Sequence, residues 1–148
     1  MNIIFISSTG THQALVAAHI FLGRLHKPDF RYVTGFCDSV YDRSGFPIYI
    51  GEDSEGRKIY TLGVGKDVLM GKKTLEDLRN ILGFTEKELV IEPVFIPGQS
   101  LIAMVTKWPK ILGGDHLNVL VATYLLRKHF QTIQKTVEDL QVRLNKMH

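Results

Sequence analysis

The N-terminal segment constrains the fold of this chain more than any other. The apolar run Ile3–Ile6 leads into the polar segment Ser7–Gln13, which continues without a break into Ala14–Ala18. A run that is apolar on both faces is typical of a central strand in a mainly parallel sheet, and the segment after the loop has the composition of a helix. The order strand, polar loop, helix therefore predicts an α/β architecture, with residues 7–13 at the carboxyl end of a strand.

A helix, a loop and a hairpin are expected next, in sequence order. The first helix is predicted to run to about Leu25, because Pro28 prevents its continuation. Residues 28–46 are poorly patterned and read as a loop with one short turn. The β-rich runs 47–51 and 58–62 flank a connector of turn formers, which predicts a β-hairpin with a longer loop.

A second helix and an edge strand are expected after the hairpin. Thr74 has the residue type and spacing of an N-cap, and Gly83 is placed to end the helix. The core stripe of this helix is predicted to be Leu75, Leu78, Ile81 and Leu82. Residues 89–96 are predicted to form a strand, which Pro93 places at a sheet edge or a bulge.

The C-terminal third is predicted to be helical. A short segment over 101–107 comes first. Residues 115–148 contain no Gly or Pro, which predicts one long helix or two joined near His129. A strand over 119–126 is the alternative, because that run is also β-branched and apolar. The stripe at helical spacing is Phe130, Ile133, Val137, Leu140 and Leu144, and we expect a homodimer through it.

The chain is thus predicted to form a single three-layer α/β domain over residues 1–148, with a mainly parallel sheet, a β-hairpin and a helical C-terminus. Its 148 residues, 45% of them hydrophobic and 22% charged, have globular composition and argue against disorder. A single cysteine, Cys37, allows neither an intramolecular disulfide nor a thiolate metal cluster. A chain with one cysteine fits a reducing cytoplasm, so a cytoplasmic protein is expected. No basic n-region and no membrane-length apolar run is present. The net charge of +3 comes without a nucleic-acid-binding motif, so dedicated nucleic-acid binding is not expected.

The first loop offers groups that bind anions. Backbone N–H groups at a helix start attract negative charge, and Gly10 allows close approach of a phosphate. Ser8, Thr9 and Thr11 supply hydroxyl donors, and Gln13 follows at the helix start. His12 has the chemistry of an acid, base or nucleophile and is the candidate catalytic residue. The simpler interpretation is that these hydroxyls cap the helix and satisfy the turn.

A second glycine loop precedes the C-terminal helices. Gly113, Gly114, Asp115 and His116 are expected to approach the same ligand, with Asp115 or His116 facing His12 across a cleft. Asp115 as a plain N-cap is the alternative. No metal site and no cofactor are predicted, because no His-x3-His pair or ligand cluster is present. Known phosphate-loop, serine-hydrolase and thiol-phosphatase motifs are also absent from the sequence.

Two resemblances add to these expectations. Gly10-Thr11-His12, the stretches Gly45–Asp53 and Gly56–Gly63, and the late Gly113-Gly114 together resemble an uncharacterised family of small Gram-positive bacterial proteins, a domain of unknown function. This resemblance covers most of the chain and implies no activity. The strand, Ser7, His12 and the following helix loosely resemble mannose-type phosphotransferase-system domains, which carry phosphate on a histidine.

The sequence therefore leaves three functions open. The first is binding of phosphate or another small anion at the first loop, which we favour. The second is a non-catalytic structural or assembly module. The third is a histidine phosphotransfer domain that uses His12. Whether the protein is an enzyme is left open.

Overall fold

The computed structural model describes residues 1–42, 45–105 and 114–147. Its strands, β1 (Asn2–Ser7), β2 (Ile48–Glu52), β3 (Lys58–Gly63) and β4 (Leu89–Pro93), form one sheet in the order β2-β3-β1-β4. β1 pairs in parallel with β3 and β4, whereas β2 is antiparallel to β3. The structure confirms the mainly parallel sheet, the central first strand and the hairpin. β4 is an edge strand, as its proline predicts.

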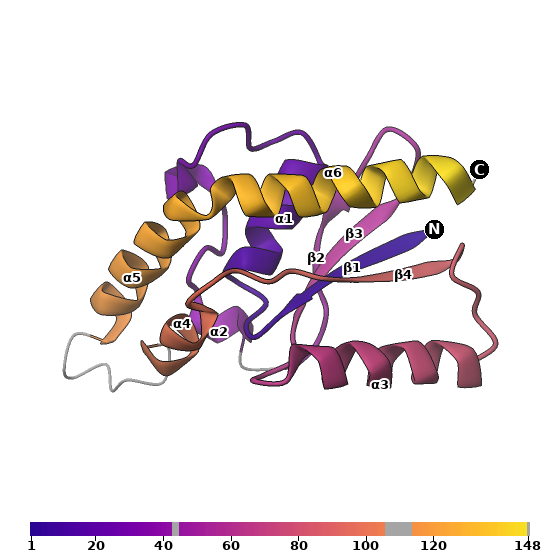
Figure 1. Cartoon of the computed structure of the whole chain (residues 1–148), viewed down its shortest axis with the longest axis horizontal. Helices are drawn as coiled ribbons and strands as arrows, with labels where there is room; N and C mark the ends of the chain where they lie inside the picture. Colours follow the sequence, from indigo (N-terminus) through magenta and orange to yellow (C-terminus); the bar gives the residue numbers. More distant parts are fainter. Residues whose placement is uncertain (43–44, 106–113, 148) are drawn as a thin grey trace.

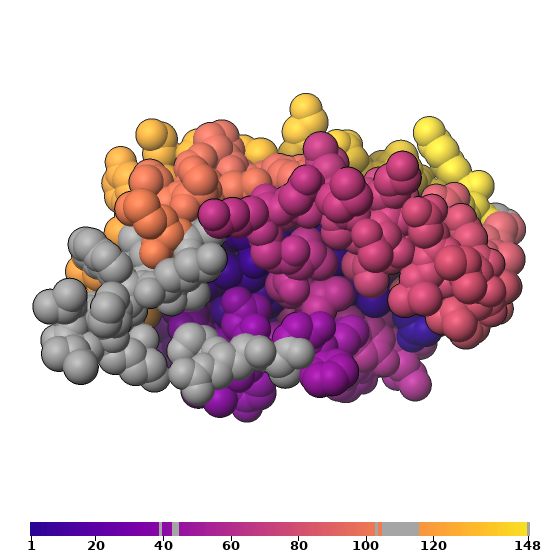
Figure 2. Space-filling view, turned by 90° about the horizontal axis from the view of Figure 1, so that it is seen from below, coloured from indigo at the N-terminus to yellow at the C-terminus, as the bar shows by residue number. Residues whose placement is uncertain are grey.

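Helices occupy both sides of this sheet. The α-helices are α1 (Gln13–Phe21), α2 (Ser39–Asp42), α3 (Val68–Ile81), α4 (Gln99–Val105), α5 (Gly114–Lys128) and α6 (Phe130–Met147), with a 3-10 turn at Phe30–Tyr32. α1 and α6 lie on one face of the sheet and α3 on the other (Figure 1). Figure 2 shows the second face, where the magenta α3 lies in front of the indigo β1. The α/β fold with its helical C-terminus is therefore confirmed.

The two cores follow from the alternation of side chains along β1. Ile3 and Phe5 are fully buried beneath α1 and α6 in the larger core. Ile6 points the other way and packs with Leu62, Val68 and Ile91 beneath α3. Successive side chains of a strand point to opposite faces, so a central strand with both faces covered is apolar throughout.

Two predicted details of the first half are wrong. α1 ends at Phe21 rather than Leu25, because Gly23 adopts a positive φ of 66° just past the helix. α3 begins at Val68, and its N-cap is Asp67, seven positions before the predicted cap Thr74. The Asp67 carboxylate accepts a hydrogen bond from the Met70 N–H at 2.9 Å. Thr74 lies within the helix and donates to the Met70 carbonyl. The predicted end at Gly83, with φ 79°, is confirmed.

The predicted core stripe of α3 is also wrong. Leu78, Ile81 and Leu82 are 48–80% exposed, and of the four predicted residues Leu75 packs against the smaller core. The helices α1 and α6 lie on the opposite face of the sheet, so neither of them covers the outer side of α3 (Figure 1).

The C-terminal region forms two helices, α5 and α6, which meet at His129. This confirms the prediction of two helices joined near His129 rather than one long helix. The strand over 119–126 is excluded, because those residues lie within α5. All five residues of the predicted α6 stripe are buried within the chain, at 5% exposure or less. The stripe is covered by α1 and the sheet, so the reason for expecting a homodimer through it no longer holds. No helix in the described ranges is long and apolar enough to cross a membrane.

Candidate functional site

The first loop is fastened to the end of the neighbouring strand. Val64 N–H donates to the Ser7 carbonyl at 2.9 Å, and Gly65 N–H donates to the Ser8 carbonyl at 3.2 Å. The contact leaves no room for a side chain on Gly63 and little room for one on Gly10. A Cβ on Gly63 would lie 2.9 Å from Gly10 N, and one on Gly10 would lie 3.1 Å from Gly63 N. The glycine in the first loop therefore permits contact with another loop of the same chain.

His12 is fully buried at the start of α1. Its Nδ1 lies 2.5 Å from the Thr9 hydroxyl oxygen, and its Nε2 lies 3.1 Å from Asn118 Oδ1. An amide oxygen only accepts hydrogen bonds, so Nε2 carries the proton and Nδ1 accepts from the Thr9 hydroxyl. Both nitrogens of a neutral imidazole are thereby satisfied.

The charge state of His12 follows from this environment. Burial lowers its pKa from 6.5 to about 4, against a smaller opposing effect of the Asn118 hydrogen bond. His12 is therefore neutral at pH 7. In this arrangement the ring links the first loop to α5 and presents no nitrogen to solvent.

The Gly10 N–H, which was expected to bind an external anion, binds an internal one. It donates to Asp42 Oδ1 at 2.6 Å, from the last residue of α2. A Cβ on Gly63 would lie 2.7 Å from the same oxygen, so the carboxylate lies directly against both loops. Burial raises the pKa of Asp42, and the hydrogen bond from Gly10 partly offsets that effect.

The other nominated residues of the first loop are mostly inaccessible. Thr9, Thr11 and Gln13 are buried, and Ser8 is half-buried. Gln13 donates through Nε2 to Gln99 Oε1 of α4 at 3.3 Å. Its Oε1 and the Ser8 hydroxyl are buried without a hydrogen-bond partner in the described part of the chain. Most of the polar atoms of this loop are thus directed into the protein.

The second glycine loop does not bring its predicted partner to His12. Gly113 lies outside the described residues, as does the side chain of Asp115, and Gly114 begins α5. His116 is exposed. The residue that reaches His12 is Asn118, which lies two positions later on α5 and is 4% exposed.

A cavity of about 250 Å³ lies beside the first loop. We call it the α1–β2 groove, because α1 forms one wall and β2 the other. Its lining residues are Gly10, Thr11, Leu15, His19, Arg24, Thr34, Gly35, Tyr41, Ile48, Tyr49 and Ile50. Of the residues nominated from sequence, Gly10 and Thr11 line it.

Arg24 lies at one end of this groove. Its Nη1 donates to the Ile50 carbonyl at 3.0 Å, and its guanidinium crosses Gly51, where a Cβ would lie 2.7 Å from Nη2. A side chain at position 51 would therefore clash with the guanidinium, and glycine allows it to pack against β2. Burial lowers the pKa of the His19 imidazole, and the nearby charge of Arg24 lowers it further. No acidic side chain of the described residues forms an ion pair with Arg24.

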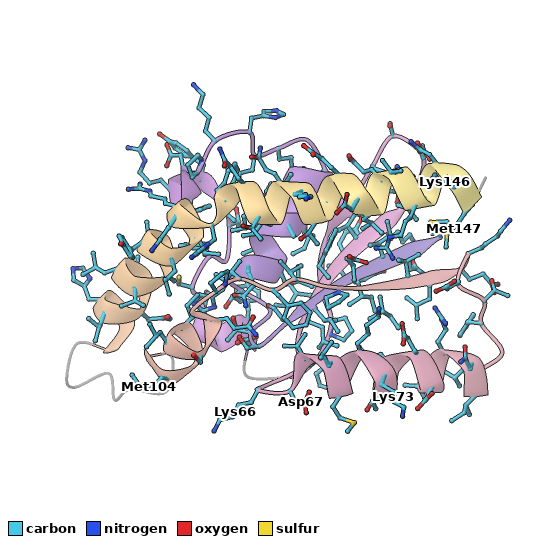
Figure 3. All side chains as sticks on the ribbon, viewed as in Figure 1. Lys66, Asp67, Lys73, Met104, Lys146 and Met147 are labelled. Atoms are coloured by element: carbon cyan, nitrogen blue, oxygen red, sulfur yellow. The ribbon has the colours of Figure 1, made fainter. Side chains whose placement is uncertain are left out.

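The remaining candidate groups are dispersed. No group of three or more His, Cys, Asp or Glu residues that would hold a metal ion occurs within the described ranges. Cys37 is half-buried, and burial raises the pKa of its thiol to about 12, so the thiol is protonated at pH 7. Lys66 is exposed, and Asp67 is the N-cap of α3. Figure 3 shows both residues at the start of this helix.

Arg24, Asp42 and Asn118 are the residues that sequence reasoning missed. Arg24 follows Gly23, at which α1 ends, and Asp42 lies in a segment read as loop. Asn118 is a polar residue on an otherwise apolar helix, and that placement was the one available signal. Each of these residues contacts a segment that is distant in sequence. Hydrophobic periodicity predicts helices and strands but not such contacts.

Comparisons with known proteins assign a family and no activity. No curated protein and no solved structure matches the chain. A family profile described as "Protein of unknown function (DUF3189)" matches residues 2–142, which is nearly the whole chain. This family is an uncharacterised one, as the sequence resemblance implied. The chain therefore belongs to the family of proteins of unknown function DUF3189.

Proposed function

We propose that this protein binds a small anionic ligand in the α1–β2 groove, beside the first strand–helix loop. The observation that carries the proposal is Arg24, which lines this concave cavity and forms no ion pair with any residue that the structure describes. A guanidinium has five N–H donors in a planar fork, and Nη1 donates to the Ile50 carbonyl. The other donors suit a carboxylate or phosphate.

The neighbouring groups support an anion at this end of the groove. His19, half-buried beside Arg24, offers a further N–H donor. The adjacent cavity shares His19, Arg24 and Thr34 with the groove and is also lined by Lys27 and by Asp29, whose carboxylate is paired with Arg31. Lys27 therefore adds a second positive charge near Arg24, and positive charge raises the local concentration of an anion. The sequence predicted an anion at the Gly10 N–H, but that group donates to Asp42. The proposed anion site is therefore at Arg24, in the same groove.

A non-catalytic structural or assembly module is the second candidate, because the polar groups of the first loop are turned inward. Thr9, His12 and Asn118 form a closed chain of hydrogen bonds without an external ligand. For a histidine phosphotransfer domain, by contrast, His12 would have to leave its buried position to meet a phosphoryl donor. The proposal assigns binding and no reaction.

Isothermal titration calorimetry with inorganic phosphate, sulfate and acetate tests the proposal. Wild type should bind at least one of these anions, and Arg24→Ala should weaken binding roughly 10-fold or more, since a charge-assisted hydrogen bond contributes about 1.5–3 kcal/mol. Lys73→Ala is the matched control, because Lys73 is exposed on α3 across the sheet from the groove (Figure 3). Equal affinities of wild type and Arg24→Ala would refute the proposal.

A further inference from the structure

The outer side of α3 is apolar at both ends of the helix. Met70, in the first turn, is 60% exposed, and Ile81, the last residue of the helix, is 80% exposed. Other large exposed apolar side chains accompany them, namely Leu69 at the start and Leu78, Leu82 and Phe84 near the end. Single exposed apolar residues are common on proteins, whereas groups of them mark places where another molecule binds.

The middle of the same side is charged. Lys73 and Asp77 are both exposed, and Figure 3 shows Lys73 on the side of α3 away from the sheet. Along the helix, residues at intervals of three or four share one face. Such intervals connect Met70, Lys73, Asp77 and Ile81 in turn. One face of α3 therefore carries an apolar group, a cation, an anion and a second apolar group in that order.

The two central charges are available to another molecule. The other charged residues of α3 are already in ion pairs, Lys72 with Glu76 at 3.5 Å and Arg79 with Glu86 at 3.9 Å. Lys73 and Asp77 form no ion pair with any residue that the structure describes, although their spacing of four residues allows one between them. Together they carry no net charge, so this face does not favour a strongly acidic or strongly basic partner.

The order of side chains is complementary to itself when the helix is reversed. A two-fold axis level with position 75 places Lys73 of each copy beside Asp77 of the other, because both positions are two residues from the axis. The same axis brings Met70 of each copy within one position of Ile81 of the other. In a parallel pair, by contrast, each charge would face its own counterpart, and like charges repel.

We propose that the outer side of α3 binds a second copy of this chain, with the two α3 helices antiparallel. The apolar ends contribute burial of surface, and the Lys73 and Asp77 pairs set the direction. The 14 residues of α3 span about 21 Å, so the contact is small and the dimer is weak. This surface is distinct from the α6 stripe, which is buried within one chain, and it lies across the sheet from the α1–β2 groove (Figure 1).

Sedimentation equilibrium of the full chain between roughly 10 μM and 1 mM, the range of weak association, tests this proposal. Wild type should be a reversible mixture of monomer and dimer. Lys73→Asp brings four carboxylates together and Asp77→Lys brings four ammonium groups together. Each change should weaken association about ten-fold, the scale of two exposed ion pairs replaced by repulsion. The double variant Lys73→Asp/Asp77→Lys restores the pairs and should dimerise as wild type does.

Lys135→Asp is the matched control, because Lys135 and Asp139 have the same spacing at exposed positions of α6, on the other face of the sheet. This change should leave association unaltered. All the substituted positions are exposed, so the variants should fold like wild type. A wild type that stays monomeric up to the highest concentration, single variants that dimerise as wild type does, or a double variant that stays monomeric would each overturn the proposal.

Discussion

His12 Nε2 lies 3.1 Å from Asn118 Oδ1, although 106 positions separate the two residues in the chain. This hydrogen bond joins the first loop to α5, and both partners are buried. A buried polar pair of this kind stabilises the fold only while both members are present. The first predictions concern this pair.

Asn118→Ala should destabilise the protein by about 1–3 kcal/mol, because it leaves the His12 N–H buried without an acceptor. Chemical unfolding in urea measures the loss. The matched control is Asn145→Ala, the same change at an exposed position of α6, which should alter the free energy of unfolding by less than about 0.5 kcal/mol. Losses of equal size in the two variants would contradict the assigned role of Asn118.

His12 should make the stability fall with acid. Its pKa in the folded state is about 4, below the ordinary 6.5, so between these values the unfolded chain binds the extra proton. The free energy of unfolding should therefore decrease as pH falls from about 6.5 to 4, by about 2 kcal/mol at pH 5, at about 1.4 kcal/mol for each pH unit. Urea unfolding of wild type and His12→Gln at pH 7 and pH 5 isolates this contribution.

The pH slope should be smaller in His12→Gln than in wild type, because the glutamine does not titrate. His116→Gln serves as the control, since His116 is exposed and its loss should leave the wild-type slope unchanged. A His12→Gln protein with the wild-type slope would show that His12 is not the buried neutral base described above.

The N-cap of α3 gives a local prediction. Asp67→Ala removes the acceptor of the Met70 N–H and should cost about 1 kcal/mol. Asp77→Ala, at an exposed position inside the same helix, should cost much less. Equal effects on the urea midpoint would mean that the helix does not begin at Val68.

The α6 stripe gives a prediction about the core. Leu140 is 1% exposed, so Leu140→Ala should cost about 2–5 kcal/mol, whereas Val142→Ala, at a residue 52% exposed, should cost far less. Because the stripe is buried within one chain, the loss in Leu140→Ala should not depend on protein concentration. A loss that disappears on dilution of both proteins would place the stripe in an interface between chains.

The course of the chain was largely predictable from sequence, because apolar periodicity and turn residues are local signals. β1, the hairpin, the edge position of β4 and the break at His129 follow from such signals. The start of α3 did not, since Thr74 and Asp67 are both suitable caps and only the packing of Val68 under the sheet favours the earlier start. The exposure of Ile81 likewise depends on which helices share its face.

The candidate site was less predictable than the fold. The sequence places Gly10 and Thr11 beside a strand end, and both line the groove. It does not reveal that Asp42 takes the Gly10 N–H or that Arg24 folds back across Gly51, because both contacts depend on tertiary packing. His12 was nominated for its chemistry, but its burial was not visible in the sequence.

Amide NMR of the wild-type protein during a titration with inorganic phosphate tests the central claim most directly. If an anion binds in the α1–β2 groove, the resonances of Thr34, Gly35 and the backbone near Arg24 should shift with one common saturation curve. The same resonances should remain unshifted in Arg24→Ala. Shifts confined to α3 or to the outer side of α6, or identical shifts in Arg24→Ala, would contradict the account.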